Sequence, residues 1–268
     1  GVATALFFVV NQAGTSEEIF SGMIAVDPFA VFFKSLTAIC ALIIILFSAY
    51  SAEVQTTVKR MAEYYALLIT MTLGMFLMAG ATNLLMMVLA MEMTSLSSYI
   101  LAGYTKEASD SSEASLKYII YGAVSSGVML YGISILFGLS GAMNYAGINR
   151  ALTLSAPNYS ALLIATIFIV VGFGYKISAV PFHFWTPDVY EGAPITITAF
   201  LSVASKAAGF AMMMRFFKVI FIDTTILALP SGVWMSLYNF EWNKLLVILS
   251  VLTMTLGNLV AVWQDNLK

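Results

Sequence analysis

The stretch "ALLIATIFIVVGFGYKISAVPFHFW", from Ala161 to Trp185, begins as an apolar run and ends with a lysine, a proline and the only histidine of the chain. About 20 mostly apolar residues are enough for a membrane-spanning helix, so the run predicts one. Pro181 lacks a backbone N–H and its ring crowds the preceding turn, so we expect the helix to break near Lys176 and Pro181. Broken backbone at membrane depth is tolerated only where it is buried in protein or lines a water-filled cavity. The stretch therefore predicts a polar site inside the membrane.

The composition of the whole chain indicates the same environment. The 268 residues are 60% hydrophobic and 10% charged, and the mean hydropathy is +0.92, whereas a soluble domain is about a quarter charged. We therefore expect a multi-span protein embedded in a lipid bilayer. The sequence has no basic block that would indicate nucleic-acid binding, and its single cysteine, Cys40, excludes an internal disulfide and a cysteine-based metal site.

The apolar segments predict an all-α polytopic membrane protein, a bundle of about seven full transmembrane helices plus a partial one. The partial span is expected at 1–10 and the full spans at 29–50, 61–81, 84–103, 114–138, 161–186, 194–221 and 243–263. Tyrosines and tryptophans near the span ends are interpreted as an interfacial belt. The chain begins without methionine inside an apolar run and stops soon after a span, which indicates a piece of a longer protein, truncated at both ends.

Three ionisable residues lie well inside the predicted spans: Glu92, Lys176 and Lys206. Each costs about 2.5–3.5 kcal/mol at a helix centre, so three unpaired charges would cost on the order of 10 kcal/mol, comparable with the stability of many folded proteins. We expect them to face the bundle interior, where they are paired or hydrated. Such residues usually mark ion or proton paths. The alternative is a buried Glu–Lys pair that only fixes helix packing.

Four further ionisable residues are weaker candidates. Lys117 lies near the start of its span, where snorkelling to the interface and a functional role are both open. His183 has a side chain suited to passing protons near neutrality, although a structural role is also open. One histidine without cysteine ligands offers little for a metal site. Asp188 and Glu191 are expected in a short, solvated loop.

Four segments carry a resemblance to a known family. They are "GYKISAVPFHFWTPDVYEGAP" (Gly174–Pro194), "TAFLSVASKAAGFA" (Thr198–Ala211), "LAMEMTSLSSYIL" (Leu89–Leu101) and "EASLKYIIYGA" (Glu113–Ala123). Together they resemble the antiporter-like membrane subunits of bacterial NADH–quinone oxidoreductase, or respiratory complex I, and "PDVYEGAP" is typical of its N-type subunits. The resemblance covers nearly the whole chain.

The resemblance implies an internal organisation for the single membrane domain, 1–268. Residues 61–221 would form the first of two inverted five-helix repeats, and 242–264 would begin the second, the remainder of which is missing from the chain. By motif, the proton-transfer residues would be Glu92, Lys176, Lys206 and Lys117, with His183 as a further part of the path and Pro181 as the helix break.

The resemblance also implies a function. The chain would belong to a proton-translocating subunit of a redox-driven enzyme in the bacterial cytoplasmic (inner) membrane, beside the other membrane subunits of complex I. NADH, flavin, iron–sulfur clusters and quinone would be bound by partner subunits. This chain shows no GxGxxG motif and no cysteine cluster, so we expect no cofactor site, no metal site and no redox residue in it. The alternatives are a sodium/proton antiporter subunit and a structural membrane scaffold.

Overall fold

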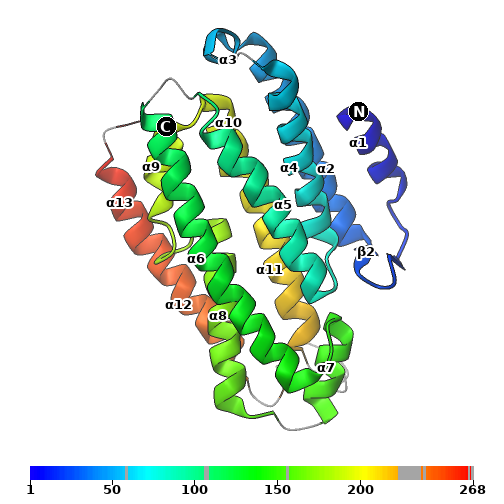
Figure 1. Cartoon of the computed structure of the whole chain (residues 1–268). Helices are drawn as coiled ribbons and strands as arrows, with labels where there is room; N and C mark the ends of the chain where they lie inside the picture. The colour runs from blue at the N-terminus through cyan, green and yellow to red at the C-terminus, as the bar shows by residue number, and fades with distance from the viewer. Residues whose placement is uncertain are drawn as a thin grey trace.

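The computed structural model describes residues 1–57, 60–105, 109–154, 157–222, 237, 240–264 and 266. Long helices run side by side in a bundle (Figure 1). Seven helical segments of the described chain are long and apolar enough to cross a membrane: Pro28–Tyr50, Met61–Gly80, Leu84–Ala102, Asp110–Ser140, Tyr159–Ile177, Ile195–Ile220 and Trp242–Val262. The predicted all-α bundle of seven full spans is confirmed.

These spans carry the labels of Figure 1. They are α2 (Pro28–Tyr50), α4 (Met61–Gly80), α5 (Leu84–Ala102), α6 (Ser109–Ser140), α8 (Tyr159–Ile177), α10 (Ile195–Phe200) with α11 (Lys206–Ile220), and α12 (Trp242–Leu252) with α13 (Asn258–Val262). A π-helical turn joins the two parts of each of the last two spans, at Leu201–Ser205 and at Thr253–Gly257. The predicted partial span is the short apolar helix α1 (Val2–Asn11). The shorter helices are α3 (Ala52–Thr57), α7 (Tyr145–Leu154) and α9 (Trp185–Gly192).

The fifth full span is shorter than predicted. It ends at Ile177 instead of residue 186, because Ser178 adopts the left-handed conformation, with φ of 57° and ψ of 41°. The N–H of Ala179 then donates to the carbonyl oxygen of Gly174 at 2.8 Å, which closes the helix end. The break predicted near Lys176 and Pro181 is therefore present, and α9 resumes at Trp185.

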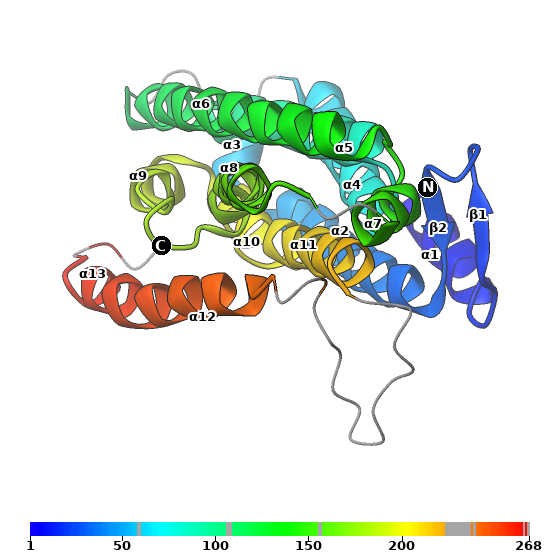
Figure 2. The same ribbon diagram turned by 90° about the horizontal axis from the view of Figure 1, so that it is seen from below.

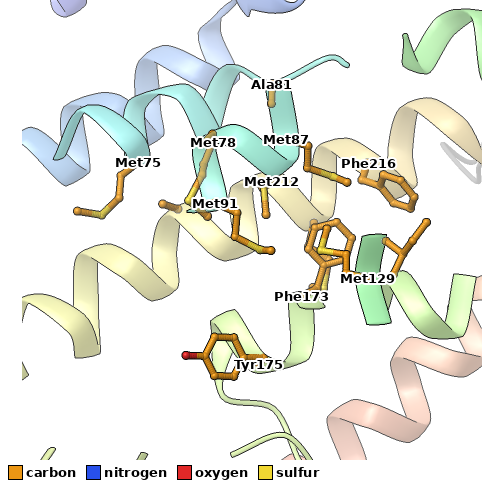
Figure 3. Packing of buried hydrophobic residues seen from close by; sticks show 14 of the residues in the cluster. Met75, Met78, Ala81, Met87, Met91, Met129, Phe173, Tyr175, Met212 and Phe216 are labelled. Atoms are coloured by element: carbon orange, nitrogen blue, oxygen red, sulfur yellow. The ribbon is translucent and has the colours of Figure 1, made fainter. Parts of the chain in front are cut away.

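Methionines and aromatic rings fill the centre of the bundle. Figure 3 shows Met78 and Met91 lying close to Met212 of α11, with Met75, Phe173 and Phe216 in the same cluster. Methionine is unbranched and polarizable, so it fills irregular gaps between helices. Elsewhere the backbones approach directly: a Cβ at Gly132 of α6 would lie 2.7 Å from the carbonyl oxygen of Ala165 in α8.

Two peripheral parts complete the fold. A short antiparallel hairpin of β1 (Glu17–Ile19) and β2 (Ile24–Val26) joins α1 to α2, and the sequence analysis did not predict it. At the opposite edge of the bundle α12 and α13 run as one rod outside the other spans (Figure 2). None of the residues in the apolar window of Trp242–Val262 is buried.

A buried ion pair joins the start of α2 to α11. Arg215 Nη1 and Nη2 donate to Asp27 Oδ2 and Oδ1 at 2.7 and 2.8 Å, and Arg215 Nε donates to the carbonyl oxygen of Ala79 at 3.1 Å. Asp27 also accepts from the N–H of Ala30 and so caps α2. Arg215 and Lys34 are both buried within spans. These two charges were not named from the sequence; they lie toward span ends and are buried where α2 packs against α11.

Replacing Asp27 with asparagine should destabilise the protein while keeping the helix cap, since asparagine is also a good N-cap. We expect a loss of about 3 kcal/mol, the low end of the range for breaking a buried pair, because Asp27 remains 28% exposed. Burial favours the neutral acid, but Arg215 and Ala30 N–H outweigh it and hold the pKa of the Asp27 carboxyl below its ordinary value of 3.8.

Because the pKa of Asp27 is lowered, the dependence of stability on pH provides a second test. The stabilisation from Asp27 is present above its ordinary pKa and is lost as pH falls through the lowered one. Thermal denaturation in detergent should therefore show the largest gap between wild type and Asp27→Asn near neutrality, and a closing gap under strong acid. Equal melting temperatures at pH 7 would show that the pair does not stabilise the fold.

Candidate functional site

Glu92 occupies the middle of α5 and faces α6. Helix α5 begins where the Asn83 side chain accepts from the N–H of Leu85, and the chain then stays helical to Ala102. The half-buried Glu92 Oε1 accepts a hydrogen bond from Ser126 Oγ of α6 at 2.5 Å. A hydroxyl hydrogen bond of this kind stabilises a carboxylate.

Lys176 lies in the last turn of α8 and points at the same helix. Its side chain is 2% exposed, and Nζ donates to Ser95 Oγ of α5 at 3.2 Å. Ser95 is three residues after Glu92, so both groups lie on one face of α5. The Glu92 charge acts on Lys176, yet within the described residues no Nζ–carboxylate distance between the two is 4 Å or less. The two charges are neighbours that are not in contact.

Lys206 begins α11, directly after the π-helical turn. Its Nζ donates to Ser178 Oγ at the helix break and lies 4.9 Å from the ring centroid of Trp185, a cation–π contact. Three residues later, Gly209 lets α11 pack directly on α8: a Cβ there would lie 2.9 Å from Ile177 Cγ2 and 3.3 Å from Lys176 Cγ. The small residue therefore brings the helix of Lys206 against the end of the helix of Lys176.

A cluster of aromatic rings holds the broken helix in place. Tyr118 of α6 stacks on Trp185 of α9 at 4.4 Å between ring centroids and meets Tyr99 of α5 edge-on at 4.7 Å. Trp185 Nε1 donates to the carbonyl oxygen of Tyr175 at 3.2 Å. All four rings are buried. The interpretation as an interfacial belt was wrong for them, because α9 folds back and covers rings that lie near span ends.

Lys117 lies on the outer part of α6 in a three-residue ion network. Its Nζ is 2.6 Å from Asp188 Oδ2 and 2.7 Å from Glu113 Oε1, and its side chain is 38% exposed. Asp188 and Glu191 belong to helix α9, and Asn266 Nδ2 donates to Glu191 at 3.1 Å. The expected loop was wrong for both, because the chain becomes helical again at Trp185, but both residues are exposed to solvent as predicted.

His183 and Pro181 lie in the irregular segment between α8 and α9. His183 lines a cavity of about 360 Å³ between the break and α13, together with Ser178, Thr186 and Tyr190. The buried Nδ1 of His183 has no hydrogen-bond partner in the described chain. Burial lowers the pKa of the His183 imidazole below its ordinary value of 6.5, so the ring is neutral at neutral pH. Pro181 follows the end of α8 and is exposed.

The predicted residues thus divide into a central group and a peripheral one. Glu92, Lys176 and Lys206 come together from α5, α8 and α11, His183 borders the cavity beside them, and Lys117 belongs to a separate ion network. Three serines that accept from or donate to the central charges were not predicted from the sequence: Ser95, Ser126 and Ser178. Serine is common in membrane helices, so its pairing with a charge on another helix leaves no local signal.

Residues 81–268 match the family model described as NADH:quinone oxidoreductase/Mrp antiporter, TM. The chain belongs to this family. Every predicted site residue lies in the segment that matches the antiporter family: Glu92, Lys117, Lys176, Pro181, His183 and Lys206. The membership predicted from the motifs is confirmed.

Relatives within this family are similar over nearly the whole chain. It is 50% identical to NADH-quinone oxidoreductase subunit N 2 of Chloroherpeton thalassium, covering 100% of this chain and 51% of that protein. It is 41% identical to NAD(P)H-quinone oxidoreductase subunit 2 of the cyanobacterium Nostoc sp., covering 98% of this chain and 48% of the relative. The chain therefore spans about half the length of the relatives it matches.

Solved structures of the family show the same fold. A chain of respiratory complex I from Thermus thermophilus superposes with a TM-score of 0.76 at 29% identity, covering 98% of this chain and 51% of that one. A chain of the Mrp complex from Dietzia sp. gives a TM-score of 0.75 at 21% identity, covering 98% of this chain and 46% of its own length. The second likeness establishes only the fold.

Proposed function

We propose that this chain is part of the proton-translocating N-type membrane subunit of an NADH–quinone oxidoreductase. The observation that carries the proposal is the convergence of Glu92, Lys176 and Lys206 from three helices at one helix break. Intramembrane ionisable residues that face the bundle interior mark ion and proton paths. The 50% identity to a subunit N supports the assignment to a redox-driven pump.

The central step is a change of partner by Lys176. Its ammonium rests on Ser95, and the Glu92 carboxylate, on the same face of α5, accepts from Ser126. In the alternative arrangement Lys176 moves to Glu92 and forms an ion pair, which at about 4 Å and an effective dielectric near 20 is worth roughly 4 kcal/mol. The closed pair holds the proton on Lys176, and the open pair releases it toward Lys206.

Lys206 acts as the relay that follows. Its ammonium contacts the Ser178 hydroxyl and the ring faces of Trp185 and Tyr190. Within the described chain no carboxylate lies within 4 Å of it to compete for its proton. His183, neutral and next to a cavity, is placed to extend the path. Lys117, paired with Asp188 and Glu113, modulates the charge of the outer part of α6.

The remaining assignments concern the whole assembly. Residues 61–221 form the first five-helix repeat, and 242–264 begin the second. The full subunit lies among other membrane subunits of complex I in the bacterial cytoplasmic membrane, while partner subunits bind NADH, flavin, iron–sulfur clusters and quinone. Redox chemistry in those partner subunits drives the movement of Lys176 from Ser95 to Glu92.

The proposal is tested on the full-length subunit, tagged and expressed in its own organism. Purification of the intact assembly should yield the flavin and iron–sulfur subunits by mass spectrometry. Inverted membrane vesicles should acidify when NADH is added with quinone, and an uncoupler should abolish the acidification. A matched preparation from a strain without the gene should show neither result.

The other outcomes select the competing functions. Sodium-dependent proton exchange by an assembly without flavin and iron–sulfur subunits would identify a cation/proton antiporter, whose fold this chain also shares. Normal NADH-driven acidification after neutral substitution of all three central charges would identify a structural scaffold. Either result would overturn the proposal.

A further inference from the structure

Ser178 occupies the point at which α8 breaks. Its φ of 57° lies in the left-handed region, which residues other than glycine, asparagine and aspartate rarely adopt. Strained backbone positions of this kind cluster at functional sites. Ser178 follows Lys176 by two residues, and its hydroxyl contacts Lys206 across the interface between α8 and α11. One side chain therefore lies at the junction of the two lysine-bearing helices.

The hydrogen bonds of Ser178 leave its own proton unused. A hydroxyl group has one proton to donate and two lone pairs that accept. Ser178 Oγ accepts from Lys206 Nζ and from Thr186 Oγ1, the latter at 2.8 Å. Both lone pairs are thus occupied, and the hydroxyl proton is directed away from Lys206 and Thr186.

The Ser178 hydroxyl proton can instead point into the cavity beside the helix break. This cavity has a volume of about 360 Å³ and is lined by Ser178, His183, Thr186 and Tyr190, among others. Two of these lining residues each bury a polar atom without a partner among the described residues, Nδ1 of His183 and the hydroxyl of Tyr190. Buried polar atoms of this kind are normally satisfied by ordered water. At about 30 Å³ for each water molecule, the cavity is large enough for several.

We infer that Ser178 positions Lys206 and conducts its proton into this cavity, toward His183. The inference deepens the proposed function and rests on it. In the step, an N–H bond of the Lys206 ammonium breaks and a new O–H bond forms at Ser178 Oγ. At the same time the original Ser178 O–H bond breaks and its proton passes to cavity water and then to the His183 imidazole. Lys206 ends neutral, Ser178 is unchanged, and the positive charge has moved to the imidazole.

The contrasting explanation is that Ser178 only ends the helix. In that case its backbone conformation matters and its hydroxyl does not. The two explanations differ for a matched pair of variants, Ser178→Thr and Ser178→Val. Both carry a β-branched side chain with the same cost at positive φ, and they differ only in the hydroxyl.

The experiment measures NADH-driven proton pumping in inverted vesicles that contain the whole enzyme with each variant. We expect Ser178→Ala to lower pumping by about tenfold or more, in keeping with the loss of a positioned proton-transfer group. The Ser178→Thr variant should pump several times faster than Ser178→Val. Ser202→Ala, which removes an exposed hydroxyl bonded only to its own helix, should pump like wild type.

The outcomes separate this inference from the function on which it rests. Normal pumping by Lys206→Ala would overturn the proposed function itself. Loss of pumping in Lys206→Ala together with normal pumping in Ser178→Ala would overturn only the role of Ser178. Equal pumping by the Ser178→Thr and Ser178→Val variants, at equal amounts of assembled enzyme, would likewise leave Ser178 a purely structural helix end.

Discussion

Replacing Lys206 with alanine in the full-length subunit should abolish proton translocation through this part of the enzyme. Lys206 is the only described cation that contacts Ser178 at the helix break, and its Nζ also lies over the rings of Trp185 and Tyr190. Positioned proton-transfer groups contribute about 10²–10⁴ to a rate. We therefore expect pumping coupled to this subunit to fall by at least about a hundredfold.

A second substitution at this position separates charge from proton exchange. Arginine in place of Lys206 keeps the positive charge, but a guanidinium does not release its proton at any relevant pH. The Lys206→Arg variant should therefore pump no better than Lys206→Ala. Lys218→Ala, an exposed lysine on the same helix, is the matched control and should pump normally. Normal pumping stoichiometry in Lys206→Ala would eliminate the relay role.

The second large effect is expected for Glu92→Gln. Glutamine has the size of glutamate and can still accept from Ser126, but it removes the charge to which Lys176 would move. Of the roughly 4 kcal/mol available to the closed pair, a loss of only 1.4 kcal/mol already slows a step tenfold. We expect coupled turnover to fall by about tenfold or more, with an altered dependence on pH.

The control for Glu92→Gln is Glu63→Gln at the start of α4. Glu63 is paired with Arg60 at 3.1 Å, and its side chain is 59% exposed, so its neutralisation should change turnover little. If Glu92→Gln has the turnover rate and the pH dependence of wild type, the exchange of partners at Lys176 does not occur. Structures of the two variants would then show whether Lys176 remains on Ser95.

Much of the fold follows from local properties of the chain. Six of the seven predicted spans end within a few residues of the observed helices, because each must present about 20 apolar residues to lipid. The exception is the span that ends at Ile177, where the left-handed conformation of Ser178 closes the helix three residues before Pro181. A serine in the sequence does not predict a left-handed conformation, because tertiary contacts are what maintain the strained backbone.

The identities of the central charges could also be predicted, whereas their partners could not. Glu92, Lys176 and Lys206 are conspicuous because an unpaired charge in an apolar run is costly. The partners in the structure are hydroxyls, Ser95 for Lys176 and Ser178 for Lys206, from segments distant in the sequence. The ion pair of Asp27 and Arg215 was not predicted either, because the two residues are 188 positions apart in the sequence.

The sequence by itself determined that this chain is a helical membrane protein of the antiporter-like family, and that its charges lie beside a helix break. Hydrophobic length, proline chemistry and long motifs are local properties, so they can be read without coordinates. Only the tertiary structure decided which groups meet at "GYKISAVPFHFW". There Gly209 allows α11 to pack against Lys176, and Ser178 contacts Lys206. Helix α9 places Trp185 in the core, where it stacks on Tyr118. Contacts between distant segments depend on how the helices pack, and no single segment encodes that packing.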